Sequence, residues 1–460
     1  LMFEIDFKKP IHVYFVGIGG ISMSGLAEVL LAEGFQISGS DMKESSLTDK
    51  LSSLGATIYY GQTVSHIDES VDLVVYTAAI HEDNPEYITQ TKLGIPSLTR
   101  AELLGQLMRN YKLPIAVSGT HGKTTTTSMV AEVLLASDTD PTLSIGGILK
   151  SIGGNIRVGK SPYFVTEACE YTNSFLSFFP KIGIILNVEE DHMDFFKDIH
   201  EIVDSFHKFA QLLPADGTLI INDGIEHKET IMNALNCTII RYGFTPDCDY
   251  CASDISYDEL GHGIYTLIRK NGSSCKVTLG VPGLHNISNS LAAFALSDTL
   301  GLKEENTLKA LKAFSGTNRR FEYKGQIGGI TIIDDYAHHP TEIAATLTAA
   351  RNFPHKTLWC IFQPHTYTRT KAFLKEFAQA LLPADKIILA PIYAARETDT
   401  LGISSVTLKE EIEKLGKECL YFDTFDEIEN YLLQNSINGD LLITMGAGDI
   451  VKVGENLLGL

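Results

Sequence analysis

Short apolar runs alternate with longer amphipathic stretches along most of the chain, and the alternation falls into three successive units. This pattern is typical of strands and helices that alternate, which predicts mostly parallel sheets covered by helices. The 460 residues also exceed what one hydrophobic core usually holds, since domains average roughly 150 residues. We therefore predict an α/β protein of three domains, at residues 1–112, 113–317 and 318–460.

The first unit has the element order of a dinucleotide-binding fold. Its predicted strand, glycine turn, helix and second strand lie at residues 11–16, 17–20, 21–32 and 35–40. In such a unit the glycines let the backbone approach a diphosphate at the helix N-terminus, and an acid such as Asp41 holds a ribose. Ser22 replaces the third glycine of the GxGxxG pattern and Gly25 comes three residues later, which weakens the prediction of a plain NAD site.

The second and third units repeat the alternation. In the second unit we predict a strand at 115–118, a helix at 128–135, strands at 163–166 and 182–187, and a strand-rich part at 219–279. In the third unit we predict strands at 329–333, 357–362, 386–391, 419–422 and 441–444. Helical stretches between the strands again indicate a mostly parallel sheet.

Composition and charge exclude several classes of protein. The chain has 37 basic and 57 acidic residues, and its net charge of -20 repels nucleic acid and anionic membranes. No apolar segment approaches the ~18 residues of a membrane span, and seven scattered cysteines do not resemble a disulfide framework. We expect a cytoplasmic protein, monomer or homodimer, that binds small molecules and neither nucleic acid nor a membrane.

The segment GTHGKTTTT at residues 119–127, between a predicted strand and a predicted helix, predicts a phosphate site. Backbone N–H groups there can cradle the β- and γ-phosphates of a nucleotide, Lys123 supplies a compact positive charge, and the Thr124 hydroxyl can bind Mg²⁺. Val117 stands where the general Walker pattern has glycine, so the loop is a variant. Motor proteins, kinases and ligases share such loops, so the loop alone does not identify the reaction.

Acidic residues and a histidine follow two predicted strands of the second unit, at positions 167, 170 and 189–192. Ligands of open α/β sheets collect at the carboxyl ends of the strands, so we expect these side chains to face the phosphate loop. Glu167 and His192 are predicted, with Thr124, to bind Mg²⁺ that neutralises a transferring phosphoryl group. The remaining acids are interpreted as structural residues such as helix caps: Glu170, Glu189 and Glu190.

Eight motifs, in order along all three units, resemble those of the Mur ligase family. They are GIGGISMSG (17–25), GTHGKTTTT (119–127), EACEYTNSFL (167–176), NVEEDHMDFF (187–196), PGLHNISN (282–289), RRFE (319–322), DDYAHHP (334–340) and QPHTYTRT (363–370). The resemblance implies a Rossmann-like UDP-binding domain, a central P-loop ATPase-type domain, and a C-terminal Rossmann-like α/β domain that closes on ATP and binds the amino acid.

The resemblance also implies a role for each matched residue. In the first domain the implied UDP-sugar contacts are Gly19, Gly20, Ser22, Met23, Ser24 and Asp41. The implied ATP contacts are Gly119, Thr120, His121, Gly122, Lys123, Thr124, Thr125, His285, Asn286, Asn289, Arg319 and Asp335. The implied catalytic residues are Lys123, Glu167, His192, Arg320, His338 and His339, with His339 and Arg369 also binding substrate.

These roles imply an ATP-dependent carboxylate–amine ligase that joins L-alanine to the lactyl carboxylate of UDP-N-acetylmuramate in peptidoglycan precursor synthesis. A carboxylate cannot expel oxide, so ATP must first convert it to an acyl phosphate, which the amine of alanine then attacks. His338 or His339 is expected to deprotonate the amine. Closure of the third domain is expected to exclude water from the acyl phosphate.

Three alternatives remain open. A recycling ligase of the same family adds a tripeptide to the same nucleotide sugar, and the sequence does not fix the size of the amino-acid pocket. An NAD-dependent dehydrogenase leaves the phosphate loop unused, and a nucleotide-sensing protein gives no reason for the acids, histidines and arginines near the phosphate path.

Two positions depart from a common form of the family pattern. Cys169 stands where many members have Asp, which weakens any acid role there. Thr366 stands where some members have Arg, and this leaves Arg369 as the only arginine of that motif.

Overall fold

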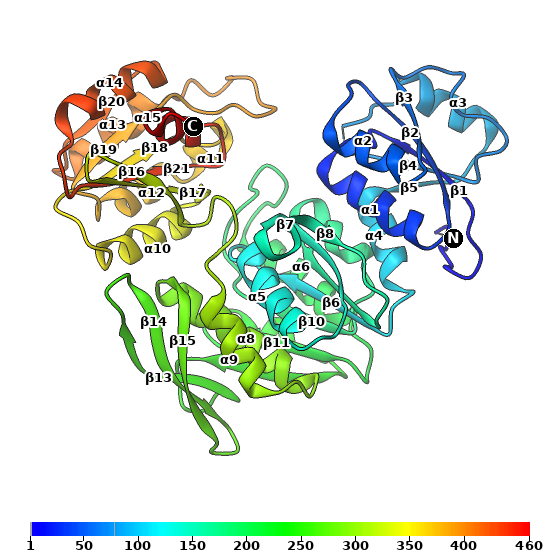
Figure 1. Cartoon of the computed structure of the whole chain (residues 1–460), viewed down its shortest axis with the longest axis horizontal. Helices are drawn as coiled ribbons and strands as arrows, with labels where there is room; N and C mark the ends of the chain where they lie inside the picture. Colours follow the sequence, from blue (N-terminus) through cyan, green and yellow to red (C-terminus); the bar gives the residue numbers. More distant parts are fainter. Residues whose placement is uncertain (1, 78) are drawn as a thin grey trace.

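The computed structural model describes residues 2–77 and 79–460, and these residues form three lobes, each built on its own sheet (Figure 1). The N-terminal and C-terminal lobes lie on either side of the view, and the central lobe lies between and below them (Figure 1). The predicted fold class, a three-domain α/β protein, is confirmed.

The N-terminal lobe has a parallel sheet of five strands. In spatial order these are β3 (Thr57–Tyr60), β2 (Gln36–Asp41), β1 (His12–Val16), β4 (Leu73–Tyr76) and β5 (Ser97–Thr99). The helices are α1 (Ile21–Ala32), α2 (Ser46–Ser53), α3 (Pro85–Leu93) and α4 (Arg100–Met108). Reciprocal caps fix two helix starts, since the side chains of Ser45 and Thr99 accept hydrogen bonds from the N–H groups of Thr48 and Glu102.

The central lobe has a mixed sheet of ten strands, in which the strands at the two edges run antiparallel to their neighbours. In spatial order these are β15 (Ser274–Pro282), β14 (His262–Arg269), β13 (Tyr250–Tyr257), β12 (Thr238–Gly243), β11 (Thr218–Asn222), β10 (Ile182–Ile185), β6 (Leu113–Ser118), β9 (Tyr163–Ala168), β7 (Thr142–Leu149) and β8 (Gly154–Arg157). The helices are α5 (Lys123–Ala136), α6 (Ile199–Gln211), α7 (Lys228–Met232), α8 (Leu284–Thr299) and α9 (Glu304–Ala313), with 3₁₀ turns η1 (Lys150–Ile152) and η2 (Tyr171–Ser177).

The C-terminal lobe has a sheet of six strands, and only the edge strand β16 is antiparallel to its neighbour among the described residues. In spatial order these are β16 (Glu322–Ile327), β17 (Ile330–Asp335), β21 (Leu441–Met445), β18 (Leu358–Phe362), β19 (Lys386–Leu389) and β20 (Cys419–Tyr421). The helices are α10 (Pro340–Arg351), α11 (Tyr367–Ala372), α12 (Leu374–Leu381), α13 (Ser405–Lys414), α14 (Phe425–Asn435) and α15 (Val451–Leu458).

Predicted boundaries of three elements next to the phosphate loop were wrong. Helix α5 begins at Lys123 rather than at residue 128, although four consecutive threonines disfavour a helix. Burial of Thr126 and Thr127 shows that tertiary packing overrides this propensity. Glu167 lies inside β9 rather than after it, and β10 ends at Ile185, so Asn187 belongs to the following loop.

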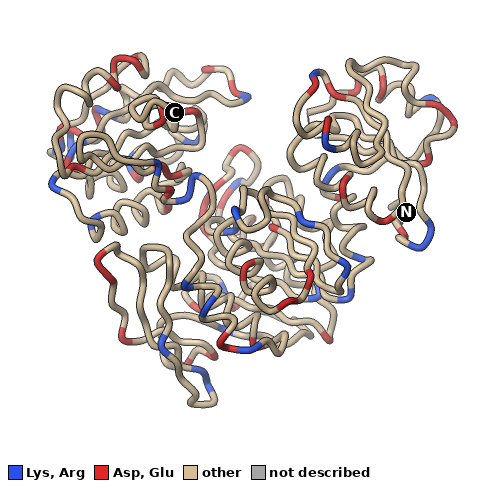
Figure 2. The backbone as a smooth tube through the Cα atoms, viewed as in Figure 1, with Lys and Arg blue, Asp and Glu red and all other residues tan. Residues whose placement is uncertain are grey.

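Charged residues are spread over all three lobes, with basic and acidic segments interleaved (Figure 2). Anionic ligands must therefore be held by local arrangements of backbone N–H groups and cations rather than by one broad basic surface. Among the described residues, no helix has the length and apolar character needed to cross a membrane.

Candidate active site between the central and C-terminal lobes

The phosphate loop connects the end of β6 to the start of α5, in the central part of the largest sheet. Two glycines with positive φ shape it, Gly119 at 147° and Gly122 at 82°. A Cβ at Gly119 would lie 2.9 Å from the Cβ of Leu186, so this close approach requires glycine. Asn187 holds the loop, because its Oδ1 accepts from the His121 N–H at 2.7 Å and its Nδ2 donates to the His121 carbonyl at 3.0 Å.

Lys123 folds back over the loop. Its Nζ donates to the carbonyl of Gly119 at 2.6 Å and lies 3.4 Å from Oε2 of Glu170. Burial lowers the pKa of Lys123, but the nearby acidic groups, Glu170 first among them and Glu167 as well, together outweigh this effect and raise the pKa above its usual value, so the amine stays charged. The lysine is therefore placed at the mouth of the loop as a fixed positive charge.

Glu170 does not cap a helix, so its interpretation as a cap was wrong. It stands at the start of η2 without making a side-chain cap hydrogen bond, and its side chain is buried. Oε2 faces Lys123, whereas Oε1 lies 3.7 Å from Nε2 of His192 and has no hydrogen-bond partner among the described residues. The signal that could have revealed it is the pair of acids three residues apart, at 167 and 170, at the end of a buried strand.

Of the three predicted metal ligands, Thr124 and Glu167 are in contact. The Thr124 hydroxyl donates to Glu167 Oε2 at 3.1 Å, and Glu167 Oε1 accepts from the N–H of Gly146 at 2.6 Å. His192 instead contacts Glu170, and its ring stacks on that of Tyr171 with centroids 4.5 Å apart. Glu170 thus lies between the lysine of the phosphate loop and the third predicted ligand.

Cys169, which departs from the family pattern, is set among these charges. Burial raises the pKa of its thiol. The side chain is therefore neutral at physiological pH and does not act as an acid in place of the usual Asp.

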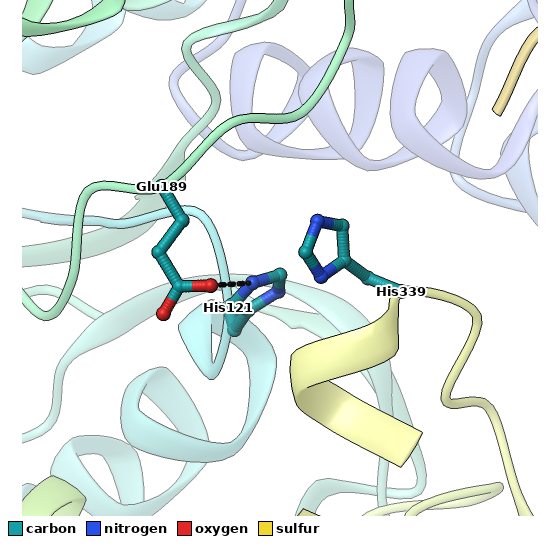
Figure 3. Close-up of side chains that lie close together, drawn as sticks. All are labelled: His121, Glu189 and His339. Atoms are coloured by element: carbon teal, nitrogen blue, oxygen red, sulfur yellow. Dashed lines mark hydrogen bonds and ion pairs between the residues drawn. The ribbon is translucent and has the colours of Figure 1, made fainter. Parts of the chain in front are cut away.

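His121 links the phosphate loop to the C-terminal lobe. Its Nε2 lies 3.2 Å from Oε2 of Glu189 and its Nδ1 lies 3.3 Å from Oε1 of Glu342 on α10 (Figure 3 shows the Glu189 contact). Burial lowers the pKa of His121, but the two carboxylates outweigh it and raise the pKa to about 9. The imidazolium is thus held between acids of two lobes. Glu189 is one of these two acids, and it is not the helix cap that we predicted.

His339 lies beside His121, with ring centroids 4.4 Å apart (Figure 3). Its Nδ1 accepts from the backbone N–H of Thr341 at 3.2 Å, so Nε2 carries the proton and donates to the Glu190 carbonyl at 2.8 Å. Both nitrogens are engaged, which leaves no lone pair for a metal or a proton. His121, Glu189 and His339 therefore join the lobes rather than form a metal site.

His338 is placed differently. Its Nδ1 lies 3.1 Å from the Tyr336 carbonyl, an acceptor only, so Nδ1 carries the proton and Nε2 has a lone pair. Burial lowers the pKa of His338 to about 4, which keeps the ring neutral near pH 7. The ring lies 5.7 Å from that of His365, centroid to centroid, on the C-terminal side of the interface.

A cavity beside the phosphate loop, here called the loop cavity, has a volume of about 140 Å³. It collects most of the residues predicted to bind ATP, together with Arg320, which was predicted to be catalytic: His121, Gly122, Thr125, His285, Asn286, Asn289 and Asp335. Burial lowers the pKa of His285 to about 4, so that ring is neutral. Burial raises the pKa of Asp335 to about 6, although Arg320 opposes the rise.

Arg319 and Arg320 are adjacent in the sequence but have different surroundings. The Arg319 guanidinium donates to Oδ2 of the buried Asp334 at 2.9 Å and to the carbonyls of Gly446 and Gly448. Both guanidinium groups lie near the Tyr336 ring, 5.0 and 5.1 Å from its centre, but only Arg320 also lines the loop cavity. Arg319 is therefore committed to the C-terminal lobe itself, whereas Arg320 faces the loop.

A second cavity, of about 620 Å³, lies between the central and C-terminal lobes and is here called the interlobe cavity. The central lobe contributes Tyr171, Asp191 and His192, and the C-terminal lobe contributes Arg369 among others. Arg369 Nε donates to Asp191 Oδ1 at 3.2 Å across the interface. Since His192 also contacts Glu170, the interlobe cavity reaches the charged cluster at the phosphate loop.

The residues predicted to bind a UDP-sugar lie in the N-terminal lobe, apart from this cluster (Figure 1). Helix α1 begins after Gly20 without a side-chain cap, and the Asp41 carboxylate accepts from the Gly19 N–H at 2.8 Å. The side chains of Met23 and Ser24 are buried, so these two positions offer a ligand backbone groups only. Ser22 is exposed on the first turn of the helix.

Comparison with known proteins finds one family along the chain. Family models described as Mur ligase family, catalytic domain, Mur ligase middle domain, and Mur ligase, glutamate ligase domain match residues 12–112, 117–297 and 319–448. Proteins named UDP-N-acetylmuramate–L-alanine ligase from Lachnospira eligens and Caldanaerobacter subterraneus are 60% and 50% identical, each over 99% of this chain and 100% and 99% of their own lengths.

Solved structures give the same result. The UDP-N-acetylmuramate-alanine ligase of Thermotoga maritima has a TM-score of 0.79 and is 28% identical, with 98% of each chain covered. The murein peptide ligase of Psychrobacter arcticus has a TM-score of 0.69 at 26% identity, also with 98% of each chain covered. With the sequence, the fold and the phosphate-loop geometry in agreement, the chain belongs to the Mur ligase family.

Proposed function

We propose that this enzyme joins L-alanine to the lactyl carboxylate of UDP-N-acetylmuramate, with ATP, through an acyl phosphate in peptidoglycan precursor synthesis. Relatives of that name match the chain over nearly their whole length, at up to 60% identity in L. eligens. The observation that carries the mechanism is the continuity of the site. The phosphate loop, the buried Glu170 and the interlobe cavity meet at His192, so that a phosphoryl donor and an amine can reach one carboxylate.

ATP would bind in the loop cavity, with its phosphates along residues 119–125. Lys123 and the backbone N–H groups at the start of α5 would stabilise charge on the transferring phosphoryl group. Asn286 and Asn289 line the same cavity, as does Arg320 from the C-terminal lobe. The nucleotide would thus touch both lobes and favour their closure.

The donor set at the loop fits Mg²⁺, which would supply charge neutralisation for phosphoryl transfer. The available groups are the Thr124 hydroxyl, the Glu167 and Glu170 carboxylates and the His192 ring. Hard cations prefer oxygen ligands, and Glu170 Oε1 is a buried carboxylate oxygen without a hydrogen-bond partner among the described residues. We therefore add Glu170 to the three ligands proposed from the sequence.

Between the two histidines, the hydrogen bonds favour His338 as the base that deprotonates the amine. A base needs a free lone pair, and in His338 this is Nε2. His339 has both nitrogens engaged and would position the lobes instead.

The UDP-sugar would bind in the N-terminal lobe, with its diphosphate at the start of α1, where backbone N–H groups and the helix dipole favour an anion. Its lactyl carboxylate would extend from there to the loop. We further propose that residues 1–112, 113–317 and 318–460 are the three domains, and that the reaction takes place in the cytoplasm.

Phosphate release from ATP is the test. Release should be negligible with ATP alone and should become rapid only with UDP-N-acetylmuramate and L-alanine together, since the acyl phosphate forms on the sugar and is consumed by the amine. Glycine and L-serine differ from L-alanine by one small group, so we expect a preference of about 1–3 kcal/mol for L-alanine. A higher kcat/KM for the L-Ala-D-Glu-diaminopimelate tripeptide would instead favour the recycling activity.

A further inference from the structure

The interlobe cavity is lined by two arginines and a lysine, Arg369, Arg396 and Lys371. Arg369 already has an anionic partner, because its Nε lies 3.2 Å from Asp191 Oδ1 and both side chains are largely buried. Within residues 2–77 and 79–460, neither Lys371 nor Arg396 forms an ion pair within 4.0 Å. The charge available to an anionic group in this cavity therefore comes from Lys371 and Arg396.

The backbone around Arg396 is hydrogen-bonded to residues 366–367 of the same lobe, which lie next to the cavity. The Thr366 N–H donates to the Tyr393 carbonyl at 2.8 Å. The Glu397 carboxylate accepts from the N–H of Tyr367 at 2.7 Å. Because both flanks of Arg396 are held, the backbone that carries its exposed side chain has a defined position.

Each of these two segments also contains a residue with an unfavourable backbone conformation. Thr366 has φ of 67° and Ala395, next to Arg396, has φ of 53°. A positive φ is costly for a β-branched residue such as Thr366 and uncommon for alanine. Strain of this kind persists where the surrounding hydrogen bonds impose a geometry. Here those hydrogen bonds fix the backbone of the segment that carries Arg396.

Arg396 lines the same cavity as several residues of the central lobe. The Tyr171 hydroxyl donates a hydrogen bond to the Asp194 carboxylate at 2.8 Å, and both residues line the cavity with Arg396. The Tyr171 ring stacks on His192, which in turn contacts Glu170. A small molecule held at Arg396 would therefore lie in a cavity that leads to the site of phosphoryl transfer.

We propose that Arg396 binds the α-carboxylate of the incoming amino acid, an inference that rests on the proposed ligase function. The planar guanidinium matches a carboxylate with two parallel hydrogen bonds, whereas the ammonium group of Lys371 is a point charge without that geometry. Thr366, which also lines the cavity, contributes no charge, and Arg369 is neutralised by Asp191. Arg396 then determines that the substrate is an amino acid with a free carboxylate.

The experiment compares L-alanine with L-alaninamide, which keeps the amine and the methyl group but lacks the carboxylate. Arg396→Ala should raise the KM for L-alanine about tenfold to a hundredfold, the loss typical of a hydrogen-bonded charge. The preference for L-alanine over L-alaninamide should fall by a similar factor, and the KM values for ATP and UDP-N-acetylmuramate should change less than about twofold. Arg396→Lys should recover part of the loss.

Lys371→Ala is the matched control, because Lys371 lines the same cavity and is also unpaired among the described residues. Because the ammonium group supplies charge without the paired hydrogen bonds of a guanidinium, Lys371→Ala should change both the KM for L-alanine and the preference by less than about threefold. An Arg396→Ala enzyme with the wild-type KM and preference would overturn the inference while the ligase function stands. Failure of the wild-type enzyme to use L-alanine would overturn the proposed function and this inference together.

Discussion

The central lobe meets its two neighbours through chemically different interfaces. Toward the N-terminal lobe, one hydrophobic cluster runs from β1 and α4 into the central lobe and includes Val13, Leu107, Met108, Phe164 and Phe178. Toward the C-terminal lobe the contacts are polar: His121 with Glu342, Thr341 with Glu189, and Arg369 with Asp191. Met193 is a central-lobe side chain that packs against the C-terminal core.

This difference indicates which lobe moves. Separating an apolar interface exposes its whole area to water, at about 25 cal/mol per Å². Polar and charged contacts are replaced by water when they open, so each holds the lobes together by a small net amount. We therefore expect the N-terminal and central lobes to act as one body, and the C-terminal lobe to open for ligands and close over the loop cavity.

The largest expected effect follows from the position of the two proposed nucleotide sites. The UDP-sugar site and the ATP site lie on opposite sides of the apolar interface. Lys123→Ala removes the cation of the phosphate loop and should lower turnover by at least about a thousandfold. Binding of UDP-N-acetylmuramate, measured by calorimetry, should change less than about twofold, because that site lies on another lobe. Lys150→Ala, an exposed lysine of the same lobe, is the control. Loss of UDP-sugar affinity in a folded Lys123→Ala enzyme would contradict the separation.

The apolar interface itself can be broken at Gly105 on α4. A Cβ there would lie 1.9 Å from the backbone carbonyl oxygen of Ser177 in the central lobe. Gly105→Ala should therefore lower the free energy of unfolding in urea by about 1–3 kcal/mol, although alanine favours a helix by about 1 kcal/mol. Gly154→Ala, where no heavy atom lies within 4 Å of the new Cβ, should change it little. A stabilised Gly105→Ala protein would show that the lobes are not tightly docked.

A smaller effect is expected from the acids at the end of β9, next to the polar interface. Glu167→Gln and Glu170→Gln should each raise the Mg²⁺ concentration needed for half-maximal rate by about tenfold, since each removes a charged oxygen ligand. His192→Ala should act in the same direction. The control is Glu190→Gln, an exposed acid of the neighbouring loop. A wild-type Mg²⁺ titration for Glu170→Gln would mean that this acid serves only to hold Lys123.

The fold was predictable because each unit has its own hydrophobic periodicity. Buried strands such as β1 and β18 read as continuous apolar runs, and their predicted positions were correct to within one residue. The errors lie where tertiary contacts override local preference. The threonine-rich start of α5 is helical because it packs into the core and follows the glycine turn at Gly122.

The site was predictable residue by residue only where a motif has a local mechanism. The sequence places Lys123 and Thr124 on one loop, but it does not show that Glu170 faces Lys123, because that contact depends on how β9 and β6 pair. It also does not distinguish Arg319 from Arg320, which point to different partners. The contact between His121 and Glu342 joins residues from two lobes and has no local signature.

The smallest expected effect concerns the polar interface and its pH dependence. The pKa of His121 is raised from 6.5 to about 9 in the closed form, so its contacts contribute fully below about pH 6.5 and are lost as the pH rises through about 9. The ligand-free enzyme should therefore expand in small-angle scattering as the pH rises through that range. Glu189→Gln removes one of the two acids and should move the expansion to lower pH. Glu189 is partly exposed, so the change in closure free energy should be about 1 kcal/mol or less.

The control for this measurement is Asp385→Asn, which breaks an exposed ion pair with Arg351 inside the C-terminal lobe and should leave the expansion where it is. Gly105→Ala should also leave it unchanged, because Gly105 lies at the interface between the N-terminal and central lobes. If the midpoint is the same in Glu189→Gln as in the wild type, His121 does not hold the lobes together. Opening would then be controlled by the other cross-lobe ion pair of the described residues, Arg369 with Asp191.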